Sequence, residues 1–334
     1  MTNPAMNDYK SRALTEADAP AATDLVNTCY IAETGAPVVT KEEVLGEWRT
    51  PGFHLATDSL GVLTPDDRLI GMLEMWNLGE PPVRPLLFAR VHPDYCSQGI
   101  GSSMIEWAED WSQTAVENAP DGARVTLRSS TNVVNEAAAQ LLANSNFSVV
   151  RHFYRMVVEL DAPPPEPVWP EGLMVETFVD TEANHRTMYA VMEEAFADHW
   201  GHLPITFDKW MHWTETDPQY DPSLWFWVRN GDEIAAGELC RFKMTEDPGL
   251  GWIDDLAVRR PYRKRGLGQA LLLHAFGELY RRGQRKVGLG VDASSLTGAT
   301  RLYEKVGMEV VRQIVLYEKE LRPGAELSTQ TIDD

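Results

Sequence analysis

Hydrophobic and polar positions follow two different periods along the second half of the chain. Short runs rich in β-branched and aromatic residues predict strands at 173–178, 225–229, 234–242, 252–258 and 287–291. Apolar residues three or four apart predict helices at 182–197, 207–213, 266–282 and 298–305, and residues 308–320 predict a final pair of extended segments. The order β-α-α-β-β-β-α-β-α-β-β predicts an α/β domain, with a mixed sheet and helices on both faces.

The first half of the chain repeats the second in outline. Two short matches carry the repeat: residues 15–18 recur 166 positions later as 181–184, and residues 89–91 with Gly99 and Gly101 recur 167 positions later as 256–258 with Gly266 and Gly268. The nearly equal offsets predict a duplication. Residues 161–170 hold five prolines, which cannot continue a helix or a central strand. We therefore expect domains at 1–160 and 171–321, a stiff linker at 161–170, and a loose polar tail at 322–334.

Bulk properties exclude several classes of protein. The length of 334 residues suits two domains, and the formal net charge of −20 argues against nucleic-acid binding, which needs a basic face. An acidic field would favour a cationic substrate such as an amine, although acidic residues can also serve solubility alone. We expect no membrane span, because no run of about 18 apolar residues occurs.

Cysteine usage and the start of the chain bear on compartment and metals. The cysteines, Cys29, Cys96 and Cys240, are far apart and odd in number, which suits a reducing compartment. The first 20 residues lack the apolar core of a signal peptide, so we expect a cytoplasmic protein. Neither Cys-x-x-Cys nor His-Glu-x-x-His occurs, so no metal site is expected.

The segment 263–268, Arg-Lys-Arg-Gly-Leu-Gly, lies between a predicted strand and a predicted helix. Glycines there let the backbone approach a ligand closely, and the first N–H groups of a helix have no partner within it. The helix dipole adds about half a positive charge at that end. Basic residues concentrate at this point of an acidic chain: Arg259, Arg260, Arg263, Lys264 and Arg265. The pattern predicts a cradle for a pyrophosphate.

Two stretches of this half resemble the GNAT superfamily of N-acetyltransferases. Residues 256–272 are similar to its acetyl-CoA motif, Arg/Gln-x-x-Gly-x-Gly/Ala after a strand, and residues 291–308 are similar to the next strand and helix, which usually end in Leu-Tyr-x-x-x-Gly-Phe/Met. The resemblance spans residues 172–320. It implies two GNAT-like domains in tandem, each a mixed, mostly antiparallel sheet flanked by helices. It also implies transfer of acetyl from the cosubstrate acetyl-CoA to a primary amine of a small molecule or peptide.

The resemblance implies roles for the matched positions. Backbone groups of Leu256, Ala257 and Val258 would pair with the pantetheine arm, like an added strand. Tyr303 would act as the general acid toward the leaving thiolate, although a tyrosine here could also be a core residue. Ser295 stands where the family often has an asparagine that contacts the cofactor arm, and its shorter side chain reaches less far. The pyrophosphate would be held by Arg263, Lys264, Arg265, Gly266, Leu267 and Gly268, through their amides, and by Gln269.

A general base must remove a proton from the acceptor amine, and three carboxylates are candidates. Asp254, Asp255 and Glu238 lie on strands that would flank the cleft, and each could act directly or through a water molecule. Strand alternation puts Asp254 and Asp255 on opposite faces, so at most one of them faces the cleft. The family implies that the sheet opens near residues 255–258.

The first half keeps the outline of the motifs but not their chemistry. Its loop at 96–101 keeps both glycines and has Cys96 at the arginine position, and Leu142 stands where Tyr303 does. Leucine cannot donate a proton, so we expect no catalysis in this half by a mechanism in which a tyrosine protonates the thiolate. Whether this half binds the cofactor stays an open question. A tandem chain whose first half has lost parts of the motifs resembles the mycothiol synthase family. This resemblance implies an alternative acceptor, the amine of a thiol precursor.

Three questions stay open at the level of sequence. Two segments are rich in His and Trp, residues 196–204 and 207–213. They would form either one wall of the acceptor-binding site or an aromatic core between the domains. The chain could be a non-catalytic acyl-CoA sensor instead of an enzyme. A nucleotide-binding protein is the weaker alternative, because no Gly-Lys-Ser/Thr follows the glycines. The oligomeric state, monomer or homodimer, is also left open.

Overall fold

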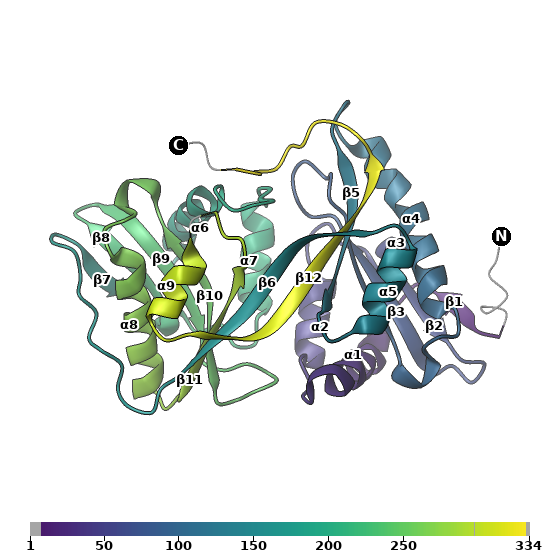
Figure 1. Cartoon of the computed structure of the whole chain (residues 1–334), viewed down its shortest axis with the longest axis horizontal. Helices are drawn as coiled ribbons and strands as arrows, with labels where there is room; N and C mark the ends of the chain where they lie inside the picture. Colours follow the sequence, from purple (N-terminus) through teal and green to yellow (C-terminus); the bar gives the residue numbers. More distant parts are fainter. Residues whose placement is uncertain (1–7, 297, 332–334) are drawn as a thin grey trace. The chain divides into compact units, whose positions relative to one another are not determined.

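The computed structural model describes residues 8–296 and 298–331. The chain divides into two compact units (Figure 1). The first holds the residues up to Arg151, Thr216–Pro218 and Ile314–Leu327, and the second holds His152–Glu215, Gln219–Gln313 and the residues from Ser328 on. Neither unit is therefore a single continuous stretch of chain.

The first half supplies six strands and five helices among the described residues. The strands are β1 Lys10–Arg12, β2 Ser59–Leu63, β3 Leu69–Trp76, β4 Leu86–Val91, β5 Val125–Asn132 and β6 Ser148–Glu159. The helices are α1 Ala19–Thr34, α2 Lys41–Trp48, α3 Leu55–Asp58, α4 Ile100–Asn118 and α5 Glu136–Asn144.

The second half follows the predicted order of elements to within a few residues. Its strands are β7 Met174–Thr177, β8 Trp225–Asn230, β9 Glu233–Arg241, β10 Leu250–Val258, β11 Lys286–Asp292 and β12 Glu309–Arg322. Its helices are α6 Glu182–Phe196, α7 Phe207–Thr216, α8 Leu267–Arg281 and α9 Ala299–Lys305. The predicted final pair of extended segments is wrong, because residues 309–322 form one continuous strand of 14 residues.

Both units contain a mixed, mostly antiparallel sheet, which confirms the predicted fold class. The strand order is β1-β2-β3-β4-β5-β12 in the first unit and β6-β11-β10-β9-β8-β7 in the second. Strands β4 and β5 run parallel in the first sheet, as do β10 and β11 in the second, and the other neighbours described here are antiparallel. The two halves therefore share one topology.

Helices cover both faces of each sheet. In the second unit, α8 and α9 pack with Phe226, Cys240 and Val287 on one face, and α6 packs with Trp225 and Leu239 on the other. Figure 1 shows α8 and α9 in front of this sheet and α6 behind it. The first unit repeats the arrangement, with α4 and α5 on one face of its sheet and α1 and α2 on the other.

The last strand of each sheet comes from the other half of the sequence. Strand β6, from the first half, pairs with β11 along Lys286↔Glu159 to Asp292↔Phe153. Strand β12, from the end of the second half, pairs with β5 along Ile314↔Asn132 to Arg322↔Val125. Periodicity cannot reveal this exchange, because an exchanged strand has the same apolar pattern as one that stays in its own half. Residues 161–170, all described, contain no helix or strand and lie within the second unit.

The described part of the tail is hydrogen-bonded, so the expectation of a loose tail is wrong there. In the first unit, the Arg124 amide donates to the Ala325 carbonyl at 2.8 Å, and the Ala325 amide donates to the Gly122 carbonyl at 2.8 Å. In the second unit, the Gly201 amide donates to the Thr329 carbonyl at 2.7 Å. Among the described residues, no helix combines the length and apolar character that crossing a bilayer requires.

Candidate active site

The sheet of the second unit opens between its two parallel strands. Strands β10 and β11 pair from Leu250↔Lys286 to Ile253↔Leu289, and the described residues beyond show no further pairing between them. The rest of β10, from Asp255 to Val258, pairs with β9 on its other side. The edge of β10 that faces β11 therefore offers unpaired backbone groups at the position where the sequence places the opening.

A β-bulge changes which faces the two aspartates take. The register between β9 and β10 shifts between Ile253 and Asp255, so Asp254 is the extra residue. Ile253 and Leu256 both pack on the face of the sheet that α8 covers. In a regular strand, side chains three residues apart point to opposite faces, so the bulge accounts for this arrangement. Asp254 is exposed and pairs with Arg241 at 2.8 Å. Of these two candidate bases, half-buried Asp255 is the one withdrawn from solvent.

The cradle at the start of α8 has the backbone geometry that its glycines predict. Gly266 is the N-cap residue, with φ of 86°, and Lys264 also has a positive φ, of 59°. No described side chain caps this helix end, and the first amide bonded within the helix is that of Ala270, to the Gly266 carbonyl. The amides of Leu267, Gly268 and Gln269 therefore point out of the helix without an intrahelical partner.

Gly268 lies where two helices pack closely. A Cβ atom at this position would lie 3.1 Å from Cδ2 of Leu302, which belongs to α9. The Lys305 ammonium, also on α9, donates to Oε1 of Gln269 at 2.8 Å. Sequence reasoning missed Lys305, because the residue lies 36 positions from Gln269 and no motif links the two.

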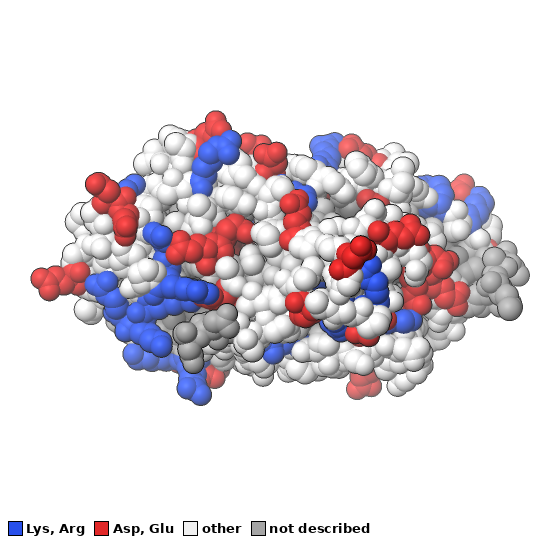
Figure 2. Space-filling model, turned by 90° about the horizontal axis from the view of Figure 1, so that it is seen from above, with Lys and Arg blue, Asp and Glu red and all other residues white. Residues whose placement is uncertain are grey.

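Most of the basic cluster beside the cradle is paired, which corrects the picture of five unopposed cations. Arg259 bonds Glu194 at 2.7 Å, and Arg260 and Arg263 both bond the buried carboxylate of Asp198. The hydrogen bonds from Arg260 are the first cause that lowers the pKa of Asp198 to about 2. Basic side chains gather on the part of the surface that belongs to the second unit (Figure 2). Of the basic residues of the cradle, Lys264 and Arg265 are exposed.

Arg263 anchors the cradle loop rather than facing a ligand. Its Nε donates to the Val258 carbonyl at 2.9 Å and its Nη2 donates to the Ala195 carbonyl at 3.2 Å. Its own amide donates to the Arg260 carbonyl at 3.2 Å. Arg263 therefore supports the loop through its side chain, and anion binding by the amides that follow it stays a prediction.

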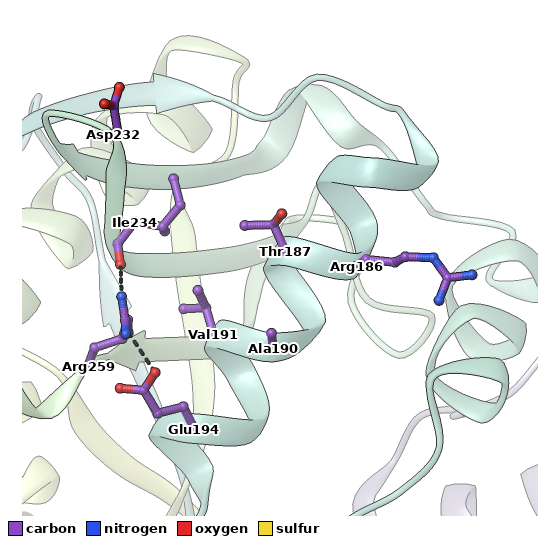
Figure 3. A pocket seen from close by; sticks show the side chains of 8 residues that line it. All are labelled: Arg186, Thr187, Ala190, Val191, Glu194, Asp232, Ile234 and Arg259. Atoms are coloured by element: carbon purple, nitrogen blue, oxygen red, sulfur yellow. Dashed lines mark hydrogen bonds and ion pairs between the residues drawn. The ribbon is translucent and has the colours of Figure 1, made fainter.

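The surface pocket in Figure 3 lies apart from the predicted chemistry. It has a volume of about 430 Å³ and is lined by the outer side of α6, the β8–β9 turn and the end of β10. Arg259 reaches into this pocket and bonds both Glu194 and the Ile234 carbonyl, the latter at 3.0 Å. None of the lining residues is a predicted acid or base.

The charges of two candidate bases act on the predicted acid. Tyr303 is 8% exposed, and burial, followed by the charges of Glu238 and Asp255, raises its pKa to about 12. Burial raises the pKa of Glu238 to about 8, and burial together with the charge of Asp254 raises that of Asp255 to about 7. Tyr303 therefore keeps its proton at neutral pH, while both carboxyls can exchange protons near it.

Glu238 is an unpartnered carboxyl in an apolar interior. It is fully buried, in a row of the sheet between Phe226 on β8 and Leu256 on β10. Neither of its carboxyl oxygens has a hydrogen-bond partner among the described residues. A buried group of this kind is rare in native proteins and indicates a missing water, ion or substrate, or a catalytic role.

Ser295 has a local structural role. Its Oγ accepts a hydrogen bond from the Ala299 amide, at 3.4 Å, in the turn that leads into α9. Its amide donates to the Asp292 carbonyl at 2.9 Å. The predicted contact with the cofactor arm stays a prediction.

The first unit keeps the backbone of the site and lacks its functional side chains. Its parallel pairing ends at Leu87↔Ser129, and Gly99 and Ser97 have φ of 82° and 62°, close to the values at the second cradle. The register Leu73↔Ala89 corresponds to Glu238↔Leu256, and Glu74↔Phe88 corresponds to Leu239↔Asp255. The residues equivalent to Glu238, Asp255 and Tyr303 are therefore Leu73, Phe88 and Leu142.

If the cradle binds the cofactor, alanine substitutions of two glycines at opposite ends of α8 should differ in their effect on acetyl-CoA affinity. Gly266 and Gly283 have φ of 86° and 108°, and at both a Cβ would meet no described atom within 4 Å. Alanine at either should cost roughly 1–2 kcal/mol of folding free energy, because the left-handed region disfavours a Cβ. Only Gly266→Ala should also weaken acetyl-CoA binding, by about tenfold, measured by calorimetry. Equal affinities in the two variants would remove the cradle from the binding site.

Comparison with known proteins defines the class. The sequence model described as Acetyltransferase (GNAT) family matches residues 21–143 and 156–308, and the chain belongs to this family. It is an acyltransferase with two GNAT domains in tandem. A GCN5-related N-acetyltransferase from Sphaerobacter thermophilus has the same fold at a TM-score of 0.78, with 36% identity, and the match covers 98% of this chain and 100% of that one.

Other relatives match most of the chain. The mycothiol acetyltransferase of Mycolicibacterium vanbaalenii is 28% identical over 317 residues, which is 89% of this chain and 92% of that protein. That of Thermobispora bispora is 28% identical over 248 residues, 72% of this chain and 77% of that protein. A tandem GNAT protein of the clavulanic acid biosynthesis pathway, 16% identical, shares the fold at a TM-score of 0.68, over 95% of this chain and 100% of that one.

Proposed function

We propose that the second unit transfers acetyl from acetyl-CoA to a primary amine of a small molecule. The observation that carries this proposal is the unpartnered carboxyl of Glu238, buried within electrostatic range of Tyr303 in a sheet that opens at β10. The first unit has leucine at both equivalent positions. The chemistry therefore belongs to the second unit.

The residues around the opening fit acetyl-CoA as a cosubstrate. The unpaired edge of β10 at residues 255–258 can take the pantetheine arm as an additional strand. The outward amides of Leu267, Gly268 and Gln269 can hold the pyrophosphate, supported by the positive end of the α8 dipole. Exposed Lys264 and Arg265 supply the cations for the remaining phosphate charge.

The reaction then needs one base and one acid. The base takes a proton from the acceptor ammonium, the free amine attacks the thioester carbonyl carbon, and the carbon–sulfur bond breaks. Tyr303 donates its phenolic proton to the departing thiolate. We propose Glu238 as the base. Burial raises its pKa to about 8 and no described group forms a hydrogen bond with its ionised carboxylate, so the carboxylate takes up a proton readily. Asp255, half-buried beside the same opening, would hold the acceptor ammonium by charge.

The relatives support a finer choice of acceptor. Two of them are mycothiol acetyltransferases that are 28% identical over 72% and 89% of the chain. We propose that the acceptor is the primary amine of a thiol-bearing compound, with other small amines as the alternative. Trp210 of α7 packs with His185 and Tyr189 inside the second unit, next to a buried core cluster.

An amine panel tests the function and its acceptor together. Calorimetry with acetyl-CoA measures binding, and mass spectrometry of the products measures transfer to amino sugars, polyamines and thiol-bearing amines. Mass detection is needed because a thiol acceptor would react with reagents that titrate released CoA. We expect binding and transfer to at least one amine. Binding without transfer to any amine would favour the acyl-CoA sensor, and a lack of binding would refute both.

A further inference from the structure

Residues 328–330 of the tail lie against the loop that follows α6 in the second unit. The Gly201 amide donates to the Thr329 carbonyl at 2.7 Å, and Oγ1 of Thr329 donates to the Ala197 carbonyl at 2.8 Å. The indole of Trp200 donates to Oε1 of Gln330 at 2.8 Å. Three hydrogen bonds thus join Thr329 and Gln330 to the loop segment 197–201. Ser328, which precedes them, is buried, and its Oγ accepts a hydrogen bond from Nε2 of Gln330 at 2.9 Å. The tail is the yellow coil at the end of the chain in Figure 1.

The same loop segment carries the anchor of the cofactor cradle. Asp198 lies between Ala197 and Trp200 and is 1% exposed. Its carboxylate bonds Nε of Arg260 at 2.9 Å and also bonds Arg263. Arg263 immediately precedes the positive-φ residue Lys264 and the N-cap Gly266. A continuous series of contacts therefore leads from the tail, through Asp198 and two arginines, to the amides that face the pyrophosphate.

We propose that residues 328–330 are a positioning clamp for the acetyl-CoA cradle of the second unit. The proposal rests on the proposed function in assigning acetyl-CoA to that cradle. The clamp touches neither the reacting atoms nor the cradle itself. It limits the motion of residues 197–201, which contain no helix or strand of their own, and so keeps Asp198 where Arg260 and Arg263 can bond it.

The location of Asp198 explains why a clamp is needed. A loop outside regular structure has no backbone ladder to hold it, and its mobility lowers the affinity of any site that depends on its position. Two of the three tail contacts are made by the loop backbone, at Ala197 and Gly201, on both sides of Asp198. Their loss should therefore change the position of the carboxylate more than the stability of the fold.

The test compares the full-length protein with four variants. Thr329→Val combined with Gln330→Ala removes both side-chain contacts, and a chain that ends after Leu327 removes all three. Thr329→Ser keeps a hydroxyl, and Leu327→Ala changes an exposed side chain of the same segment, so both serve as controls. Hydrogen exchange reports on residues 197–201 and 263–266, calorimetry on acetyl-CoA binding, and thermal melting on the fold.

We expect the double variant to exchange about tenfold faster at 197–201 and several-fold faster at 263–266, with the melting temperature nearly unchanged. Its Kd and KM for acetyl-CoA should rise about fivefold, with kcat within twofold of the unaltered protein. Both controls should match the unaltered protein. Faster exchange at 197–201 without any change at 263–266, or with an unchanged Kd, would overturn the clamp.

The two proposals can fail separately. If the unaltered protein transfers acetyl to no amine but binds acetyl-CoA, the proposed reaction fails, and the Kd of the variants still decides the clamp. If the unaltered protein does not bind acetyl-CoA, the proposed function fails. The exchange at 263–266, which needs no ligand, then decides whether the tail positions this loop.

Discussion

Tyr303→Phe should lower the turnover of acetyl transfer by about 100-fold or more and leave the Kd for acetyl-CoA within about twofold of its original value. The phenol is buried, and its pKa of about 12 keeps it protonated, so it can donate its proton to the leaving thiolate. Phenylalanine fills the same space and cannot donate. Steady-state kinetics with the best acceptor, together with calorimetry for acetyl-CoA, measures the two quantities.

Tyr280→Phe is the matched control for this prediction. Tyr280 belongs to the preceding helix of the same unit, packs beside the same core, and stacks with Arg285 at 4.0 Å. Its loss of a hydroxyl should leave turnover unchanged. If Tyr303→Phe keeps full turnover, Tyr303 is a core tyrosine and a water molecule must protonate the thiolate.

The sequence allowed the cradle to be predicted because its signal is local. Glycines at 266 and 268, a preceding strand and a following helix all lie within a short stretch, and each has its own physical reason. The structure gives Gly266 a φ of 86° and places Leu302 against the position of a Cβ at Gly268. Tyr303 was also predicted from a local string of residues, which includes the turn at Gly307, and its role as the acid stays a prediction.

Other features depend on contacts between residues far apart in the sequence. Residue type alone does not distinguish Arg260 and Arg263 from Lys264 and Arg265. The carboxylate of Asp198, more than 60 positions away, nevertheless bonds both Arg260 and Arg263. The bulge at Asp254 could not be inferred from alternation, since alternation assumes that no residue is added. The exchange of β6 and β12 depends on which edge each strand meets, and an apolar pattern does not contain that information.

The comparison between the units separates the requirements of the fold from those of the reaction. Asn146 has a positive φ of 64° where Gly307 has 89°, and the amides after them, of Phe147 and Met308, close the same turn. These features recur because both sheets need them. Glu238 does not recur, and a buried carboxyl without a partner makes folding less favourable. Leu73 at the equivalent position shows that the fold does not need a carboxyl there, which supports the proposed role of Glu238 in the reaction.

Glu238→Gln should lower turnover by at least about 100-fold and remove the rise of kcat/KM with pH that the base produces. The raised pKa, about 8, keeps most of the carboxyl protonated at pH 7. Activity should therefore rise with pH through about 8 in the unaltered protein, as the base ionises. Asp255→Asn should keep this rise and weaken acceptor binding instead. Kinetics from pH 6 to 9.5, with one acceptor throughout, separates the two carboxylates.

Glu238→Leu provides the control for folding, because it copies Leu73 of the first unit. The pKa of Glu238 is higher in the folded protein than the ordinary value of 4.5, so the folded state binds the proton more tightly. The stability of the unaltered protein therefore falls as pH rises from about 4.5 through about 8. The leucine variant should melt about 3–5 °C higher at pH 8.5, with a much smaller difference near pH 4.5. Loss of turnover together with a gain in stability would show that Glu238 serves the reaction, whereas retained turnover would exclude it as the base.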